Sequence, residues 1–150
     1  MTRYYDLDAA NAAIPELDGI LSVLAEQRAD LVRLRDQVLA GTGGGDGEPE
    51  REGPDEGRER ETDRDVVAVD ELRLTRLRMQ GLIDQMAAGV ARIDALGLTL
   101  RDIEHGLVDF PALVSGRQIW LCWQRGEQSI GFWHDLDTGF AGRRPLDELQ

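Results

Sequence analysis

Two long stretches with apolar residues at helical spacing constrain the fold of this chain most strongly. Residues 6–40 and 65–96 each predict one helix, because apolar side chains recur every three or four residues in both. The first stripe consists of Ile14, Leu17, Leu21, Leu24, Leu31, Leu34 and Val38. The second consists of Val69, Leu72, Met79, Ile83, Met86, Val90 and Ile93. Two helices of similar length with one apolar face each pack most simply as an antiparallel, coiled-coil-like hairpin.

The residues at the helix ends support these boundaries. Asp6 is a suitable N-cap for the first helix, and Asp8 would lie in its first turn, where the helix dipole favours an acid. Pro15 lacks a backbone N–H and predicts a kink near this position. Gly41 and Gly97 follow the two stripes and are typical residues for helix termination.

The segment between the helices, residues 41–65, contains glycine, proline and charged residues but no aliphatic or aromatic side chain. It cannot bury apolar surface to offset the entropy of ordering, so we expect a disordered acidic linker. Ten acids and four arginines give it −6 of the total net charge of −12. It either acts as a solvated spacer or docks onto a basic partner.

The period changes to that of strands after residue 97. Residues 98–150 predict a three-stranded antiparallel meander followed by a tail, with strands in L-T-L-R-D-I-E-H-G-L-V-D-F, R-Q-I-W-L-C-W-Q and S-I-G-F-W-H-D. The first of these would be bulged at Gly106, and P-A-L-V-S-G would be a connection. The whole chain, residues 1–150, is therefore expected to form a single α+β domain.

The last two predicted strands contain all three tryptophans and the only cysteine of the chain. A two-residue turn at Gly126–Glu127 would place Trp120 opposite Trp133 and Ile119 opposite His134. In that register both faces of the hairpin are apolar at their centre. The helices can cover only one of them.

The second face would carry an interface or ligand surface formed by Trp120, Cys122, Trp133 and, from the tail, Phe140. Three covers are consistent with this pattern. The tail could fold back over the face, a second subunit could pack on it, or a small ligand could bind there. Cys122 itself is expected to be a buried, inert thiol, because no cation is predicted beside it to lower its pKa.

Several motifs in the C-terminal half resemble those of a known group of sequences. They are E-H-G-L-V-D-F-P-A-L, L-C-W-Q-R-G-E, F-W-H-D and G-F-A-G-R-R-P-L, and the opening D-L-D-A-A-N-A-A-I-P-E-L is similar as well. The group is a bacterial family catalogued as a domain of unknown function. The resemblance runs from Tyr5 to Leu146 apart from the linker. It supports the domain boundaries and implies no catalytic residue, cofactor or partner.

Polar side chains of the sheet region could bind a divalent metal ion. The candidate cluster consists of Glu104, Asp109, Glu127 and His134. None of the common metal or phosphate motifs is present in the sequence, so the cluster is a hypothesis that depends on convergence in space. Arg143 and Arg144 form a short basic pair that could contact an anion or pair with nearby acids. No cofactor other than such a metal ion is predicted.

The charge of the chain limits its partners. Its seventeen basic residues are all arginine, and the net charge of −12 disfavours binding to nucleic acid or to an anionic membrane surface. A single cysteine excludes an intrachain disulfide, and we expect a cytoplasmic protein. Two functions therefore compete. One is a non-enzymatic interaction or structural module that self-associates, most simply as a homodimer, and the sequence does not identify any other protein partner. The other is a divalent-metal-binding protein or a metal-dependent enzyme that uses carboxylates and His134.

Overall fold

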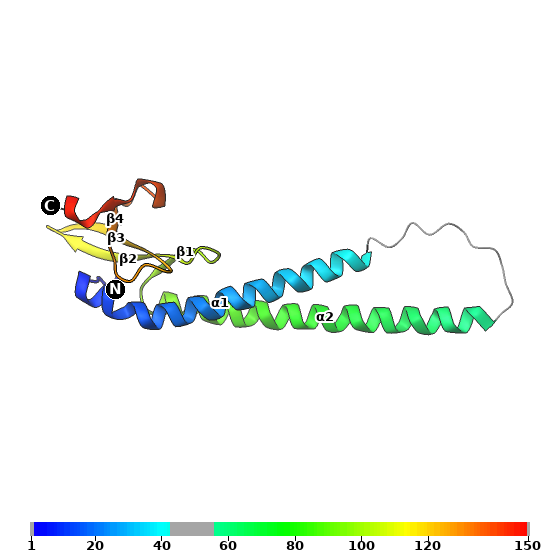
Figure 1. The fold of residues 1–150 in the computed structure, drawn as a ribbon. Helices are drawn as coiled ribbons and strands as arrows, with labels where there is room; N and C mark the ends of the chain where they lie inside the picture. Colours follow the sequence, from blue (N-terminus) through cyan, green and yellow to red (C-terminus); the bar gives the residue numbers. More distant parts are fainter. Residues whose placement is uncertain (1, 43–55, 150) are drawn as a thin grey trace. The chain divides into compact units, whose positions relative to one another are not determined.

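A computed structural model gives two helices followed by a five-stranded antiparallel sheet, which is an α+β fold (Figure 1). It describes residues 2–42 and 56–149, and the side chains of residues 2–41 and 63–149. Most of the predicted linker, residues 43–55, lies outside the described residues. The chain divides into two compact units. We call Met1–Glu26 with Met86–Gln150 the sheet unit and Gln27–Gln85 the helical unit.

Helix α1 spans Leu7–Thr42 and begins as its sequence predicts. The Asp6 carboxylate accepts a hydrogen bond from the Ala9 backbone N–H at 2.7 Å, so it caps one of the N–H groups that the first turn leaves unpaired. The helix runs through Pro15. Its buried side chains in the sheet unit are Ala10, Leu17, Ile20, Leu21 and Leu24.

Helix α2 spans Glu56–Ala95 and thus begins inside the stretch predicted as a linker. It ends in a Schellman arrangement at Gly97, whose φ is +78°. The Gly97 N–H donates to the Asp94 carbonyl and the Leu98 N–H to the Ile93 carbonyl. Leu98 and Ile93 are both buried, which supplies the apolar contact that accompanies this motif.

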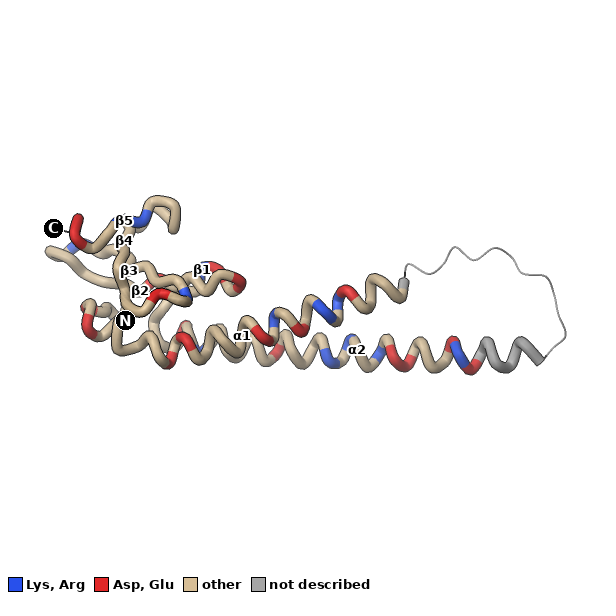
Figure 2. Tube along the Cα trace, viewed as in Figure 1, with Lys and Arg blue, Asp and Glu red and all other residues tan. Residues whose placement is uncertain are grey.

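Helices α1 and α2 contribute to both units, and the contacts between the helices differ from one unit to the other. In the sheet unit, α2 approaches α1 closely at Gly89, where a Cβ atom would lie 2.9 Å from Leu24 Cδ2. In the helical unit, the Gln27 side-chain amide donates to Gln85 at 3.2 Å, while several apolar side chains of α2 stay exposed. Acidic and basic residues alternate along both helices there (Figure 2).

The sheet has the order β1–β2–β3–β4–β5 with all neighbours antiparallel. The strands are β1 Thr99–Asp102, β2 Leu107–Val114, β3 Arg117–Gln124, β4 Phe132–His134 and β5 Arg144–Pro145. Two short 3-10 helices, Phe140–Gly142 and Leu146–Glu148, flank β5. The prediction of three strands was therefore wrong, because the first predicted strand is a hairpin and the tail contributes β5.

The hairpin between β1 and β2 explains the first of these differences. Asp102 accepts the His105 backbone N–H at 3.1 Å, and Gly106 adopts a φ of +67°, so the chain reverses where a bulge was expected. The predicted connection P-A-L-V belongs to β2 instead. Pro111 is tolerated within it because β1 reaches only as far as Asp109, so no neighbour on that side requires its missing N–H.

The register of β3 and β4 differs from the prediction by one residue. Trp120 pairs with His134 and Leu121 with Trp133, whereas a two-residue turn would have paired Trp120 with Trp133. The connection is longer than that turn and is held by specific bonds. The Glu127 N–H donates to the Gln124 carbonyl, and the Ile130 N–H donates to the Asn11 side chain of α1. A one-residue change in register moves every side chain of a strand to the opposite face.

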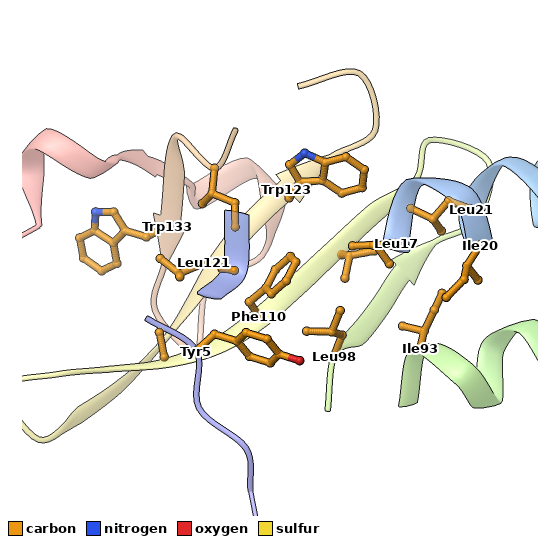
Figure 3. Packing of buried hydrophobic residues seen from close by; sticks show 14 of the residues in the cluster. Tyr5, Leu17, Ile20, Leu21, Ile93, Leu98, Phe110, Leu121, Trp123 and Trp133 are labelled. Atoms are coloured by element: carbon orange, nitrogen blue, oxygen red, sulfur yellow. The ribbon is translucent and has the colours of Figure 1, made fainter. Parts of the chain in front are cut away.

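The apolar core of the sheet unit lies between the two helices and one face of the sheet (Figure 3). The sheet contributes Val108, Phe110, Ala112, Ile119, Leu121, Trp123 and Trp133. Tyr5, which precedes α1, meets the edge of Phe110 with ring centroids 5.3 Å apart, and its hydroxyl donates to the Leu96 carbonyl. Because strand residues alternate between faces, the intervening side chains point to the other side of the sheet.

Candidate metal site

Three buried side chains converge on the face of the sheet opposite the core: Asp109 from β2, Cys122 from β3 and His134 from β4. Asp109 pairs directly with Cys122, and His134 pairs with Trp120, two residues from Cys122 on the same face. One potential ligand atom from each residue lies within 4.8 Å of the other two. All three residues are at most 3% exposed, although they lie on the face that the helices do not cover.

The hydrogen bonds of His134 orient its ring. Nδ1 lies 2.8 Å from the Asp135 carbonyl oxygen, which can only accept, so Nδ1 carries a proton. Nε2 lies 3.0 Å from Asp109 Oδ2. If Nε2 carried only its lone pair, two acceptors would face each other in a buried site. Either a second proton or a metal ion must therefore lie between His134 and Asp109.

The carboxylate of Asp109 is also held from the solvent side. Arg101 of β1 donates from Nε to Oδ2 at 2.9 Å, and its side chain is 48% exposed whereas that of Asp109 is 3% exposed. The guanidinium carbon of Arg101 lies 5.2 Å from the centre of the Trp120 ring. The Arg101 bond therefore fixes the position of the Asp109 carboxylate within the cluster.

Cys122 completes the cluster as a neutral thiol. Burial raises its pKa to about 11, and the negative charge of Asp109 adds to this effect, while Arg143 opposes it. A thiol of this kind is not a free nucleophile at neutral pH. It can become a thiolate when a metal ion displaces its proton.

A pocket of about 240 Å³ opens directly onto the cluster. Its lining contains Asp109, Cys122 and His134 together with Arg101 and Leu107. The segment between β4 and β5, residues 136–140, supplies the rest of the lining. This segment lies beside the face for which the sequence left three covers open, so the tail forms at least part of that cover.

A model of the protein family described as "Uncharacterized conserved protein (DUF2203)" matches residues 3–146. The chain belongs to this family. The match includes both helices and β1–β5, and therefore the whole candidate site. No curated protein and no solved structure matches the chain. Among the described residues of this family member, no helix is long and apolar enough to cross a membrane.

Two of the four predicted metal ligands meet in the structure, and two lie elsewhere. Asp109 and His134 are in contact, whereas Glu104 is exposed in the turn between β1 and β2. Glu127 accepts the Gln124 N–H at 2.6 Å and pairs with Arg143. The described structure therefore brings Asp109 and His134 together and places Glu104 and Glu127 elsewhere.

Cys122 takes the place of the two glutamates in the cluster. The sequence predicts an inert thiol without a cationic neighbour, but Arg143 lies close enough to lower the pKa of Cys122 and so opposes the effect of burial. Its pairing with Asp109 could have been recognised had P-A-L-V been taken as part of β2, because the Ser115–Gly116 turn then fixes the register.

The remaining predicted residues separate into two environments. Trp133 is buried in the core and not on the Trp120 and Cys122 face, because of the changed register. Phe140 lines the pocket, and the Arg143 guanidinium lies between its ring at 4.3 Å and that of Phe132 at 4.0 Å. Arg144 lies over Trp133 at 5.7 Å. The predicted anion contact at Arg143 and Arg144 stays a prediction.

Proposed function

We propose that this protein binds a divalent metal ion of the zinc class through Asp109 Oδ2, Cys122 Sγ and His134 Nε2. The observation that carries the proposal is the buried approach of Nε2 to Oδ2 at 3.0 Å, with the proton of the ring fixed on the other nitrogen. Ligating histidines commonly donate their second N–H to a backbone carbonyl, as His134 does to Asp135. The Arg101 bond to Asp109 is the corresponding support for the carboxylate.

The ligand set favours zinc over the harder cations. Zinc binds thiolate, imidazole and carboxylate at about 2.0–2.3 Å, so two ligands of one tetrahedral ion lie about 3–4 Å apart. The described cluster, with its ligand atoms within 4.8 Å of one another, is close to that spacing. Magnesium and calcium prefer oxygen ligands and would not use Cys122.

Three protein ligands beside a pocket suit chemistry better than a purely structural role. Structural zinc sites use four protein ligands, whereas catalytic sites use three and leave one position for water or substrate. A zinc-bound water loses its proton near neutral pH and serves as a nucleophile or base. The proposed function is therefore metal-dependent chemistry on a small molecule that enters the pocket between β1 and residues 136–140.

Metal titration of the chelator-treated protein tests this proposal. We expect one cobalt or zinc ion per chain, with a thiolate-to-cobalt charge-transfer absorption that Cys122→Ser abolishes. His134→Gln should lose tight binding, whereas His105→Gln should keep it, because the chain has only two histidines and His105 is exposed. If elemental analysis finds no bound metal, or if His105→Gln has the same effect as His134→Gln, a proton and not a metal ion lies between His134 and Asp109.

Self-association is a second candidate function, favoured by a separate observation in the helical unit. Helix α2 exposes Val66, Val67, Val69, Leu74, Leu77 and Ile83, which are 45–64% exposed. If α1 and α2 form the predicted antiparallel hairpin, as the contact of Gln27 with Gln85 supports, Val66, Val67, Leu74 and Leu77 lie outside its internal stripe. Val69 and Ile83 belong to that stripe and are exposed as well. We propose a second copy of the chain as their cover, since acidic and basic residues alternate along the same helix and would pair with it (Figure 2).

Light scattering over a range of concentrations distinguishes this second candidate. We expect a dimer that Leu74→Glu with Leu77→Glu converts to a monomer of unchanged helicity. The control is Leu113→Glu, which adds a charge at another exposed leucine outside the helical unit. A monomer at every micromolar concentration would contradict self-association and leave the metal proposal unaffected.

A further inference from the structure

The pocket beside the metal cluster has one strongly polar feature that the cluster does not use. Arg101 lines the pocket, and its Nε is bound to Asp109. Among the described residues, its two Nη groups make no hydrogen bond, and Trp120 supports the guanidinium from one side. The fork of an arginine fixed in this way is arranged to bind a carboxylate or phosphate through two parallel hydrogen bonds.

The charges around the site add to this preference. A divalent ion is neutralised by the Cys122 thiolate and the Asp109 carboxylate, which leaves the positive charge of Arg101 in excess. Asp137 is the other charged side chain of the lining, and like Arg101 it is exposed, so solvent screens both charges. The Asp137 carboxylate repels a second negative charge on the ligand, so the lining favours a monoanion over a dianion.

The remaining lining limits the size and the body of the ligand. A volume of about 240 Å³ is below the range of about 300–1,000 Å³ that is typical for drug-sized ligands. Leu107, Leu136 and Phe140 provide apolar walls. The pocket therefore suits a compact molecule with one charged end and an apolar remainder.

We infer that the substrate is a small monocarboxylate, whose carboxylate group binds Arg101 while its apolar body contacts Leu107, Leu136 and Phe140. This inference rests on the proposed metal site, because the residues that would hold the ion and Arg101 line the same pocket. Arg101 is then both a support for Asp109 and a residue that determines specificity.

Spectral titration of the cobalt-loaded protein tests the inference with three probes of similar shape. Benzoate carries one negative charge, phenyl phosphate carries up to two, and benzamide is neutral. We expect benzoate to change the visible cobalt spectrum with saturation, and to bind more tightly than phenyl phosphate and much more tightly than benzamide. Arg101→Gln should weaken benzoate roughly 10- to 100-fold, the loss expected for hydrogen bonds to a charged group.

Two controls keep the outcomes separate. Arg117→Gln removes an arginine that pairs with Asp135 and does not line the pocket, and it should leave benzoate affinity unchanged. Cobalt stoichiometry is measured for every variant, so that a damaged metal site is distinguished from a lost carboxylate contact. Absence of cobalt binding to the parent protein overturns both proposals. Cobalt binding without a benzoate response, or tighter binding of phenyl phosphate, overturns the monocarboxylate inference alone.

Discussion

The chain contains two Asp–His pairs of nearly equal length, one buried and one exposed, and they should differ strongly in energy. His134 Nε2 lies 3.0 Å from Asp109 Oδ2, with both side chains 3% exposed. His105 Nδ1 lies 2.8 Å from Asp102 Oδ2, with side chains 59% and 36% exposed. Distance and residue types are matched, so the two pairs differ in burial and in the other bonds of their carboxylates, which are from Arg101 to Asp109 and from the His105 backbone N–H to Asp102.

We predict that the buried pair is coupled by about 1.5–3 kcal/mol in the presence of a chelator, the range for a hydrogen bond to a charged group in a site that excludes water. The exposed pair should show coupling close to zero, because solvent and salt screen it. The hydrogen bond from His105 lowers the pKa of Asp102, but the exposed position keeps the effect on stability small.

Two double-mutant cycles measure these couplings by urea unfolding. One cycle combines Asp109→Asn with His134→Gln, and the other combines Asp102→Asn with His105→Gln. Repeating the first cycle with zinc at about 100 times its dissociation constant should stabilise only the parent protein, by about 2.7 kcal/mol. Equal coupling in the two cycles would refute the argument that burial makes the His134 pair strong. Equal stabilisation of parent and double variant by zinc would refute the assignment of the ligands.

Three further outcomes follow from the structure. Burial raises the pKa of Cys122 to about 11 from an ordinary value of 9.0, so the unfolded chain loses the thiol proton at a lower pH than the folded chain does. The free energy of unfolding should therefore fall by up to about 1.4 kcal/mol per pH unit between about pH 9 and 11. Urea unfolding measures this slope, and Cys122→Ala should lack it. Gly106→Ala should destabilise the protein by about 1–3 kcal/mol, and by more than Gly116→Ala. Both glycines have positive φ, but of the two only Gly106 would bring a Cβ atom close to another side chain, 2.5 Å from Arg125 Cβ. Thermal melts compare the two variants, and equal losses would exclude that contact as a cause. Phe110→Ala should cost about 3–5 kcal/mol by chemical denaturation, because the ring is fully buried; a loss below about 1 kcal/mol would contradict its place in the core.

Local signals predicted the helical part of the fold well, since each signal acts within a few residues. The N-cap at Asp6 and the termination at Gly97 depend on hydrogen bonds to neighbouring backbone groups, and both are present in the structure. The second strand was harder to predict. Pro111 normally argues against a central strand, and it is accommodated only because β1 is too short to reach it. The length of β1 depends on how the whole sheet is paired, and the residues around Pro111 do not determine it.

The candidate site was predicted only in part. Its polar residues could be recognised in the sequence, but its geometry depends on residues that are far apart in the sequence. Asp109 and His134 were named as ligands from their chemistry, whereas Cys122 was not. Cys122 was missed because P-A-L-V was not taken as part of β2, which pairs Asp109 with Cys122. The face of His134 depends on the turn after Gln124, whose length is set by the bonds of Glu127 and of Asn11, a residue more than one hundred positions away. Strand pairing by hydrophobic pattern alone could not determine that length, because both faces of β3 and β4 carry apolar residues.

The same register determines the core and the candidate site together. With His134 opposite Trp120, Trp133 joins the apolar face beside Leu121, and the histidine reaches the face of Asp109 and Cys122. A shift by one residue would bury the imidazole against the helices and expose the indole to the metal ligands. Burial of Trp133 thus stabilises the arrangement in which His134 is available for coordination. Insertions or deletions that lengthen or shorten the segment between Gln124 and Phe132 should therefore lose stability and metal binding together, whereas His134→Gln should lose metal binding alone.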